Sequence, residues 1–113
     1  MEPTRIVFLP RYTALYGGTT FKTPPVPAKE FAQLILTTWA NVGIGSGSTV
    51  MTLEESTDLE HWHAVGGTVS PGATEETYVR DLSLEWIRLT VAVSGSPPGL
   101  TTWAVGALVP RES

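Results

Sequence analysis

The sequence predicts an all-β domain, an antiparallel β-sandwich of jelly-roll or immunoglobulin-like topology with about seven or eight strands and an extended N-terminal arm. Short β-favouring runs are separated by turn residues at intervals of roughly 8–12 positions. Glycine (11 residues) and proline (9 residues) occur throughout the chain and leave few windows for a helix. The connections between runs are short, which favours antiparallel pairing.

The composition indicates one soluble domain with its own core. A chain of 113 residues, 42% of them hydrophobic, has the size of a single domain and needs no disulfide or metal to fold. Cysteine is absent, which excludes a disulfide scaffold, a thiolate metal site and a cysteine nucleophile. Only 16% of the residues are charged, which favours a surface that is partly covered by a partner.

The charge pattern disfavours nucleic acid and membrane partners. The net charge is −4, and the scattered positive residues form no basic stripe, so no nucleic-acid partner is expected. The start of the chain does not resemble a signal peptide, and no apolar run reaches the roughly 20 residues of a membrane helix. We therefore expect synthesis in the cytoplasm.

The N-terminal arm is expected over residues 1–27. Residues 5–9 predict a short strand that stops at Pro10, and residues 12–16 predict another that ends at Gly17-Gly18. Residues 22–27 contain three prolines and are expected to be stiff and extended. Such an arm packs on its own domain or reaches onto a neighbour, and the residues alone leave both open.

The sandwich domain is expected over residues 28–113. Strands are predicted at residues 31–42, 49–55, 61–65, 76–82, 85–94 and 101–109, and residues 69–73 are expected to carry a Ser-Pro-Gly turn. In the segment 85–94, Ile87, Leu89, Val91 and Val93 alternate with other residues and should share one face. The segments around Trp39 and Trp103 both contain Thr-Thr-Trp-Ala, so these two strands are expected to take similar positions in a sheet.

The residues with catalytic or metal-binding chemistry do not form a convincing site. His61 and His63 have strand spacing suitable for zinc, but no other histidine or cysteine completes a ligand set, so solvent-facing histidines are favoured. The adjacent carboxylates of Glu54 and Glu55 should point to opposite sides and be solvated. No nucleophile motif or phosphate loop is present. We therefore predict no enzymatic activity, no metal and no cofactor.

The tryptophans are Trp39, Trp62, Trp86 and Trp103. They suit the core or a protein interface, because tryptophan buries a large area and needs one polar partner. A sugar-binding platform is the alternative, and it requires two exposed coplanar rings.

A hairpin motif carries a family resemblance. Residues 53–62 read LEESTDLEHW and resemble the E-S-x-D-G-x-x-W hairpin of small β-sandwich virion proteins of tailed bacteriophages and prophages. Ser56 and Asp58 match as turn residues and Trp62 as the first residue of the return strand, whereas Leu59 replaces a frequent glycine. Residues 86–98, WIRLTVAVSGSPP, resemble a second strand of these proteins, and the resemblance spans roughly residues 30–109.

The resemblance implies a structural virion protein. The expected role is a capsid decoration (cement) protein that binds the major capsid protein on the outer capsid surface and associates with itself as a homotrimer. A tail component or a carbohydrate-binding module for host adhesion is the alternative. The arm is the expected contact segment, and its candidate partner-binding residues are Arg5, Phe8, Arg11, Tyr12, Tyr16, Phe21, Pro24 and Pro25.

Overall fold

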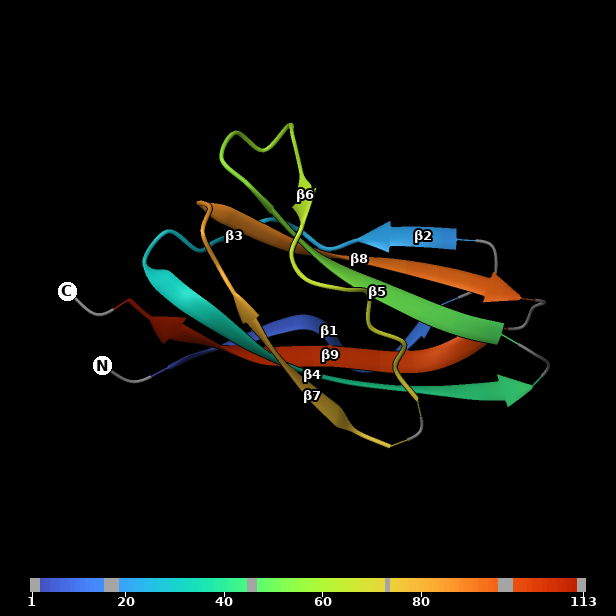
Figure 1. Ribbon diagram of the computed structural model, residues 1–113. Helices are drawn as coiled ribbons and strands as arrows, with labels where there is room; N and C mark the ends of the chain where they lie inside the picture. The colour runs from blue at the N-terminus through green and yellow to red at the C-terminus, as the bar shows by residue number, and fades with distance from the viewer. Residues whose placement is uncertain (1–2, 16–18, 45–46, 73, 96–98, 112–113) are drawn as a thin grey trace.

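A computed structural model describes residues 3–15, 19–44, 47–72, 74–95 and 99–111. The described residues form nine β-strands in two packed sheets, which confirms the predicted antiparallel β-sandwich (Figure 1). The strands are β1 (Thr4–Leu15), β2 (Thr19–Lys22), β3 (Val26–Pro27), β4 (Phe31–Ile44), β5 (Gly47–Ser56), β6 (His63–Ala64), β7 (Glu76–Asp81), β8 (Trp86–Gly95) and β9 (Gly99–Pro110). No helix in this part of the chain is long and apolar enough to cross a membrane.

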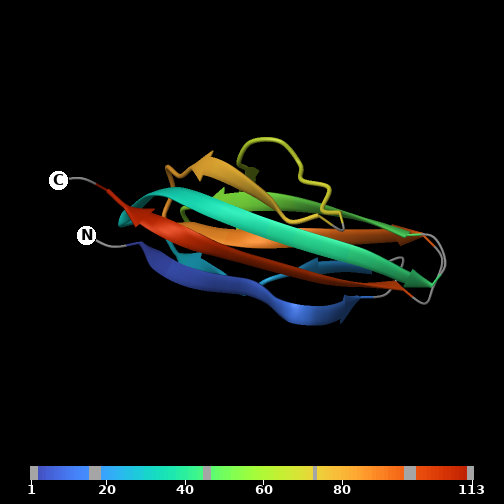
Figure 2. The same cartoon turned by 90° about the horizontal axis from the view of Figure 1, so that it is seen from below.

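The two sheets divide the strands between them. Sheet A has the order β1-β9-β4-β7, and sheet B has the order β2-β8-β5-β6, with β3 also paired to β8. All the pairings are antiparallel. In Figure 2, β1, β9 and β4 lie side by side in front of β8 and β5.

The core lies between the inner faces of the sheets. Ile87, Leu89, Val91 and Val93 are all at most 4% exposed, so the predicted alternation of β8 is confirmed. They share one buried cluster with residues of sheet A such as Leu34. Because strand side chains alternate between faces, this core uses every second residue of each central strand.

The N-terminal segment is part of the sandwich. β1 adds to β9 at the edge of sheet A, while β2 and β3 add to β8 in sheet B. The sequence left open whether the arm packs on its own domain or reaches onto a neighbour, and the structure shows it packed on its own domain. The predicted stop at Pro10 is wrong: β1 continues through it by register shifts, which an edge strand tolerates because its outer N–H groups need no partner in the sheet.

The return from β5 is less regular than predicted. The expected strand at residues 61–65 is reduced to His63–Ala64, and Val69, at the start of the expected turn segment, forms a single bridge with Met51. Gly66 interrupts this segment with a φ of +72°, and a Cβ there would meet the Arg80 side chain at 2.6 Å. The Arg80 side chain reaches this β5–β7 connection from β7. The connection therefore covers an open side of the sandwich at the point where strand pairing ends.

Removal of a core side chain tests this packing. Leu89→Ala is expected to lower the free energy of unfolding by about 2–5 kcal/mol, because Leu89 is fully buried and its loss leaves a cavity. The measurement is urea unfolding followed by tryptophan fluorescence. Thr20→Ala, at an exposed position of β2, is the control and should change the value by less than about 0.5 kcal/mol. Equal effects in the two variants would contradict the assignment of Leu89 to the core.

Candidate functional site

The predicted contact residues of the arm have different environments. Phe8 is only 7% exposed and belongs to the core, because the register shift beside it turns both Phe8 and Leu9 inward. Arg5, Pro24 and Pro25 are exposed, and Phe21 is 40% exposed. The side chains of Arg11 and Tyr12, and all of Tyr16, lie outside the described residues. Among the members of this set that the structure describes, no single cluster is brought together.

Ser56 and Asp58 organise the turn after β5. Ser56 Oγ accepts hydrogen bonds from the backbone N–H groups of Asp58 (3.2 Å) and Leu59 (2.9 Å). Asp58 Oδ1 accepts from the backbone N–H groups of Glu60 (2.9 Å) and His61 (2.8 Å). Leu59 has a φ of +67°, the conformation that the glycine of the motif would adopt, so the turn keeps its shape at a cost of about 1–2 kcal/mol.

The carboxylate of Asp58 is already engaged by this turn. The backbone N–H of His61, the His61 ring and the backbone N–H of Glu60 hold the pKa of Asp58 below its usual range. Asp58, Glu60 and His61 are the one group of potential metal ligands found within 4.8 Å of one another in the described residues, and all three are exposed. His63 does not join them, so the histidine pair considered for zinc is not assembled.

A polar network covers part of the outer face of sheet B. Arg88 donates to Glu54 Oε1 (2.8 Å), Thr90 donates to the same oxygen (2.5 Å), and the Arg88 guanidinium lies 4.1 Å from the centre of the Trp62 ring. Burial raises the pKa of Glu54, but the hydrogen bonds from Thr90 and Arg88 outweigh it and leave the pKa below its usual value. Trp62 also donates from Nε1 to the Leu59 carbonyl (3.2 Å), which ties the turn to the sheet.

Glu55 points away from this network, as predicted for adjacent strand residues. Its carboxylate accepts hydrogen bonds from the backbone N–H and hydroxyl of Ser83 and from the backbone N–H of Leu84. The expectation that Glu54 and Glu55 are solvated strand ends is wrong, since each holds protein donors. Sequence spacing misses this because both sets of partners lie about 30 residues away.

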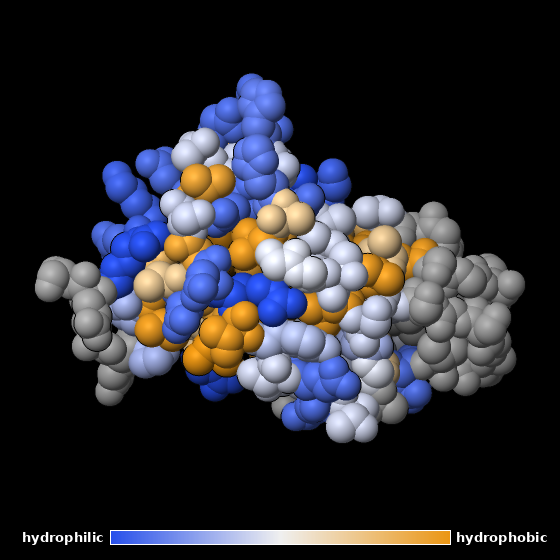
Figure 3. Space-filling view, viewed as in Figure 1, coloured by the Kyte–Doolittle hydropathy of each residue, from blue (hydrophilic) through white to orange (hydrophobic). Residues whose placement is uncertain are grey.

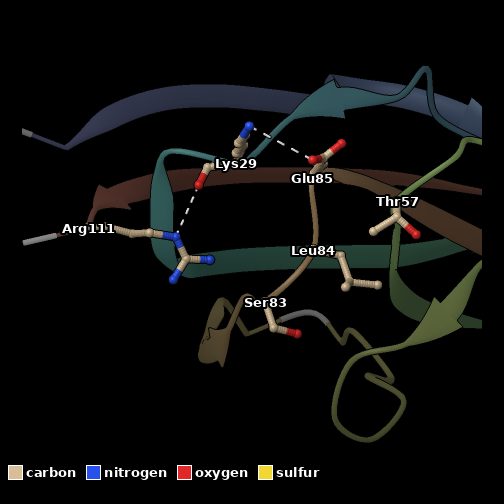
Figure 4. Close-up of a pocket in the computed structure, with 6 residues that line it drawn as sticks. All are labelled: Lys29, Thr57, Ser83, Leu84, Glu85 and Arg111. Carbon is tan, nitrogen blue, oxygen red and sulfur yellow. Dashed lines mark hydrogen bonds and ion pairs between the residues drawn. The ribbon is translucent and has the colours of Figure 1, made fainter.

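A pocket of about 420 Å³ lies at the end of the sandwich where β7 connects to β8 (Figure 4). Arg111 crosses it and donates to the carbonyls of Lys29 (3.0 Å) and Leu82 (3.1 Å). Lys29 Nζ forms an exposed ion pair with Glu85 Oε1 at 4.0 Å. These contacts hold the C-terminal segment against two connections, so we assign the pocket a structural role.

The tryptophans do not form a sugar-binding platform. Trp39 and Trp103 stack with ring centres 6.4 Å apart and an interplanar angle of 15°, but Trp103 is only 4% exposed. Trp62 and Trp86 are half-buried, and Arg88 lies over the Trp62 ring. The required pair of exposed coplanar rings is therefore missing among the four tryptophans.

The outer face of sheet A carries exposed and partly exposed aliphatic side chains beside the hydrogen-bonded pairs Thr37–Thr77 and Gln33–Asp81. The register aligns Val7 of β1 with Val105 of β9, and Ala107 of β9 with Ile35 of β4 and Val79 of β7. Val7 is 56% exposed and Val79 is 55% exposed. Figure 3 shows the neighbouring side of the sandwich, where β7 crosses β4: apolar and polar side chains are mixed there, and hydrophilic side chains project around the β5–β6 turn. This face is the strongest candidate interaction surface.

The sequence did not reveal this surface directly. Ile35 and Val105 lie in strands predicted as core, and the alternation by itself does not say which face is inward. Val79 was the residue that could have indicated this surface. It lies between Tyr78 and Arg80 in a short strand, so its side chain points to the face opposite theirs and gives that outer face an apolar group.

The fold is similar to parts of longer chains in solved structures. The crystal structure of PBSX exported protein XepA aligns with a TM-score of 0.73 at 12% identity, over 97% of this chain and 38% of that chain. The structures of infectious bursal disease virus strains Gx and Gt align with TM-scores of 0.58 and 0.55 at 11% identity, over 98% and 96% of this chain. This chain spans 32–38% of the length of those chains.

These likenesses show the β-sandwich fold. No protein-family model matches the sequence, and no curated protein sequence matches it.

The Glu54 network leads to a prediction about pH. A carboxylate whose pKa is lowered by folding stabilises the protein above its ordinary pKa of 4.5, and this contribution is lost as the pH falls. Glu54→Gln is expected to lower the free energy of unfolding by about 1 kcal/mol at pH 7. The difference from the unsubstituted protein should shrink as the pH falls from about 5 to about 3.

Urea unfolding at each pH measures this difference. Glu30→Gln is the matched control, because the exposed Glu30 side chain makes no hydrogen bond or ion pair with another described residue, so the substitution should change stability little at any pH. A Glu54→Gln effect that stays constant down to pH 3 would contradict the role given to the carboxylate charge.

Proposed function

We propose that this chain is a structural protein of a bacteriophage particle, and specifically a capsid decoration protein. In this role it binds the major capsid protein at the outer capsid surface, associates with itself as a homotrimer and reinforces the shell. The observation that carries the proposal is the outer face of sheet A, on which Val7 and Val79 are each more than half exposed. A surface of this kind is typical of proteins that work in contact with other proteins.

The polar side chains that were candidates for catalysis or metal binding have structural roles, and this supports the proposal. Ser56 and Asp58 hold a turn, Glu54 joins two strands, and Glu55 holds a connection. Each of these groups is occupied by protein donors or acceptors. An adhesive role needs no catalytic group, because many weak contacts repeated by symmetry give strong attachment.

The fold adds independent support. Structures of infectious bursal disease virus contain a chain with a similar sandwich, and the hairpin motif resembles that of bacteriophage virion proteins. The positive φ of Leu59 strengthens that resemblance, because the turn has the shape that the glycine of the motif would give. A carbohydrate-binding role has weaker support, since the tryptophans form no exposed platform.

Analysis of purified particles tests the proposal. Mass spectrometry of particles from the phage that encodes this chain should detect it, and cryo-electron microscopy should show its density on the outside of the shell. Particles made without the gene are expected to release their DNA at a lower temperature, with restored expression as the control. Absence of the chain from particles would reject a virion role, and density confined to the tail would reject decoration in favour of the tail alternative.

A further inference from the structure

We infer that a second copy of this chain covers the outer face of sheet A, with Arg5 of one copy against Asp81 of the other. The inference deepens the self-association part of the proposed function by adding a two-fold contact, and it names the surface responsible. It depends on three properties of this face: its apolar centre, its size and the placement of its charges.

The centre of the face has the composition of an interface. Val7, Ile35, Val79, Val105 and Ala107 lie in neighbouring rows across all four strands. Thr37 and Thr77 lie in the row of Val7 and Val105 and hydrogen-bond to each other (3.0 Å), so a partner would meet aliphatic side chains beside one polar pair that is already satisfied. Burying such a surface is favourable by roughly 25 cal/mol for each Å² of apolar area.

The outer face of sheet B differs in this respect. Its rows contain the Glu54–Arg88 ion pair, Thr52 beside Thr90, and Lys22 beside Thr90. An antiparallel sheet that faces water on one side has such polar residues there. The outer face of sheet A also has polar pairs, Thr37–Thr77 and Gln33–Asp81, but it differs in exposing Val7 and Val79, and this difference favours sheet A as the contact face.

The face is large enough for a stable contact. β4 is 14 residues long and β9 is 12 residues long. Four strands of up to this length, spaced about 4.8 Å apart with a rise of about 3.3 Å per residue, give a face on the order of 800 Å². A standard stable interface buries about 800 Å² on each partner, so the whole of one sheet face meets this requirement.

The charges at the borders of the face are complementary between copies. Arg5 lies on β1 at one edge, in register with Ala107, and Asp81 lies on β7 at the other edge, in register with Gln33. The two edge strands are separated by three strand spacings, about 14 Å, so these charges cannot pair within one chain. Arg5 has no ion pair with any described residue, whereas Asp81 accepts one hydrogen bond from Gln33 (2.9 Å).

This placement selects a second copy as the occupant. When the β1 edge of one copy lies over the β7 edge of another, Arg5 meets Asp81 and the aliphatic rows meet each other. Because each copy presents the same face to the other, this contact is a two-fold pair, distinct from the three-fold contact of the proposed homotrimer. One surface thus supplies both halves of the contact.

The mass of the protein in solution tests the inference. Sedimentation equilibrium and light scattering of the purified chain should show a concentration-dependent oligomer at about 100 μM. Val79→Lys is expected to weaken association at least tenfold, because a charge would enter the apolar centre. Ala92→Lys is the matched control: it adds the same charge at an exposed position on the outer face of sheet B and should leave the mass unchanged.

The charge pair is tested by exchange. Arg5→Asp and Asp81→Arg should each weaken association, and the double variant should restore it, because only the double variant again places opposite charges together. Circular dichroism and urea unfolding show whether each variant is folded. Arg5→Asp lies at an exposed edge position and is expected to keep the stability of the parent protein.

Several outcomes would overturn the inference. A monomer at all concentrations rejects the second copy, equal weakening by Ala92→Lys rejects the assignment to sheet A, and failure of the double variant to recover rejects the Arg5–Asp81 contact. These results are separable from the proposed function. A monomer that is nevertheless found on particles would indicate that the face contacts the shell and not a second copy. An oligomer that is absent from particles would support the contact between copies and reject the decoration role.

Discussion

The pairing of β4 with β9 is the constraint on which the rest of the structure depends. These two strands form the centre of sheet A, with Trp39 directly opposite Trp103 and their rings stacked. β1 attaches only to β9 in this sheet and β7 only to β4, so neither edge strand has a place without the central pair. The hydroxyl of Thr102 donates to the carbonyl of Trp39 across 63 positions of sequence, which makes this a long-range pairing with a substantial loop-closure cost.

The register of this pair also determines what each face of sheet A can do. Leu34 and Leu36 point into the core while Ile35 points outward, because side chains alternate along a strand. A slip of one residue would move Ile35 inward and expose the leucines. The inner face of β4 is distinguished by fully buried side chains packed against sheet B. Its outer face is mixed, with Ile35 between Gln33 and Thr37, and these two polar side chains pair with Asp81 and Thr77 of β7.

Local patterns predicted the parts of the fold that depend on near neighbours. The alternation in β8 and the hydrogen-bonding residues of the Ser56–Asp58 turn follow from residues within a few positions of one another. The shared Thr-Thr-Trp-Ala segments pointed to similar sheet positions, and they lie in neighbouring strands of one sheet. What could not be predicted depends on contacts across the fold: the continuation of β1 past Pro10, and the donors that Glu55 finds at Ser83.

The candidate surface shares this dependence on the whole fold, and that explains why no motif marks it. Val7 and Val79 come from opposite edge strands and reach one face only after β9 and β4 have assembled between them. Arg5 and Asp81 are likewise placed at opposite borders by strand order and not by spacing in the sequence. A catalytic site needs particular groups within hydrogen-bonding distance, whereas an adhesive face needs area, apolar character and complementary borders. In the role proposed for this chain, the sheet topology would supply the second set of requirements, with Val7 and Val79 in the centre of the face and Arg5 and Asp81 at its borders.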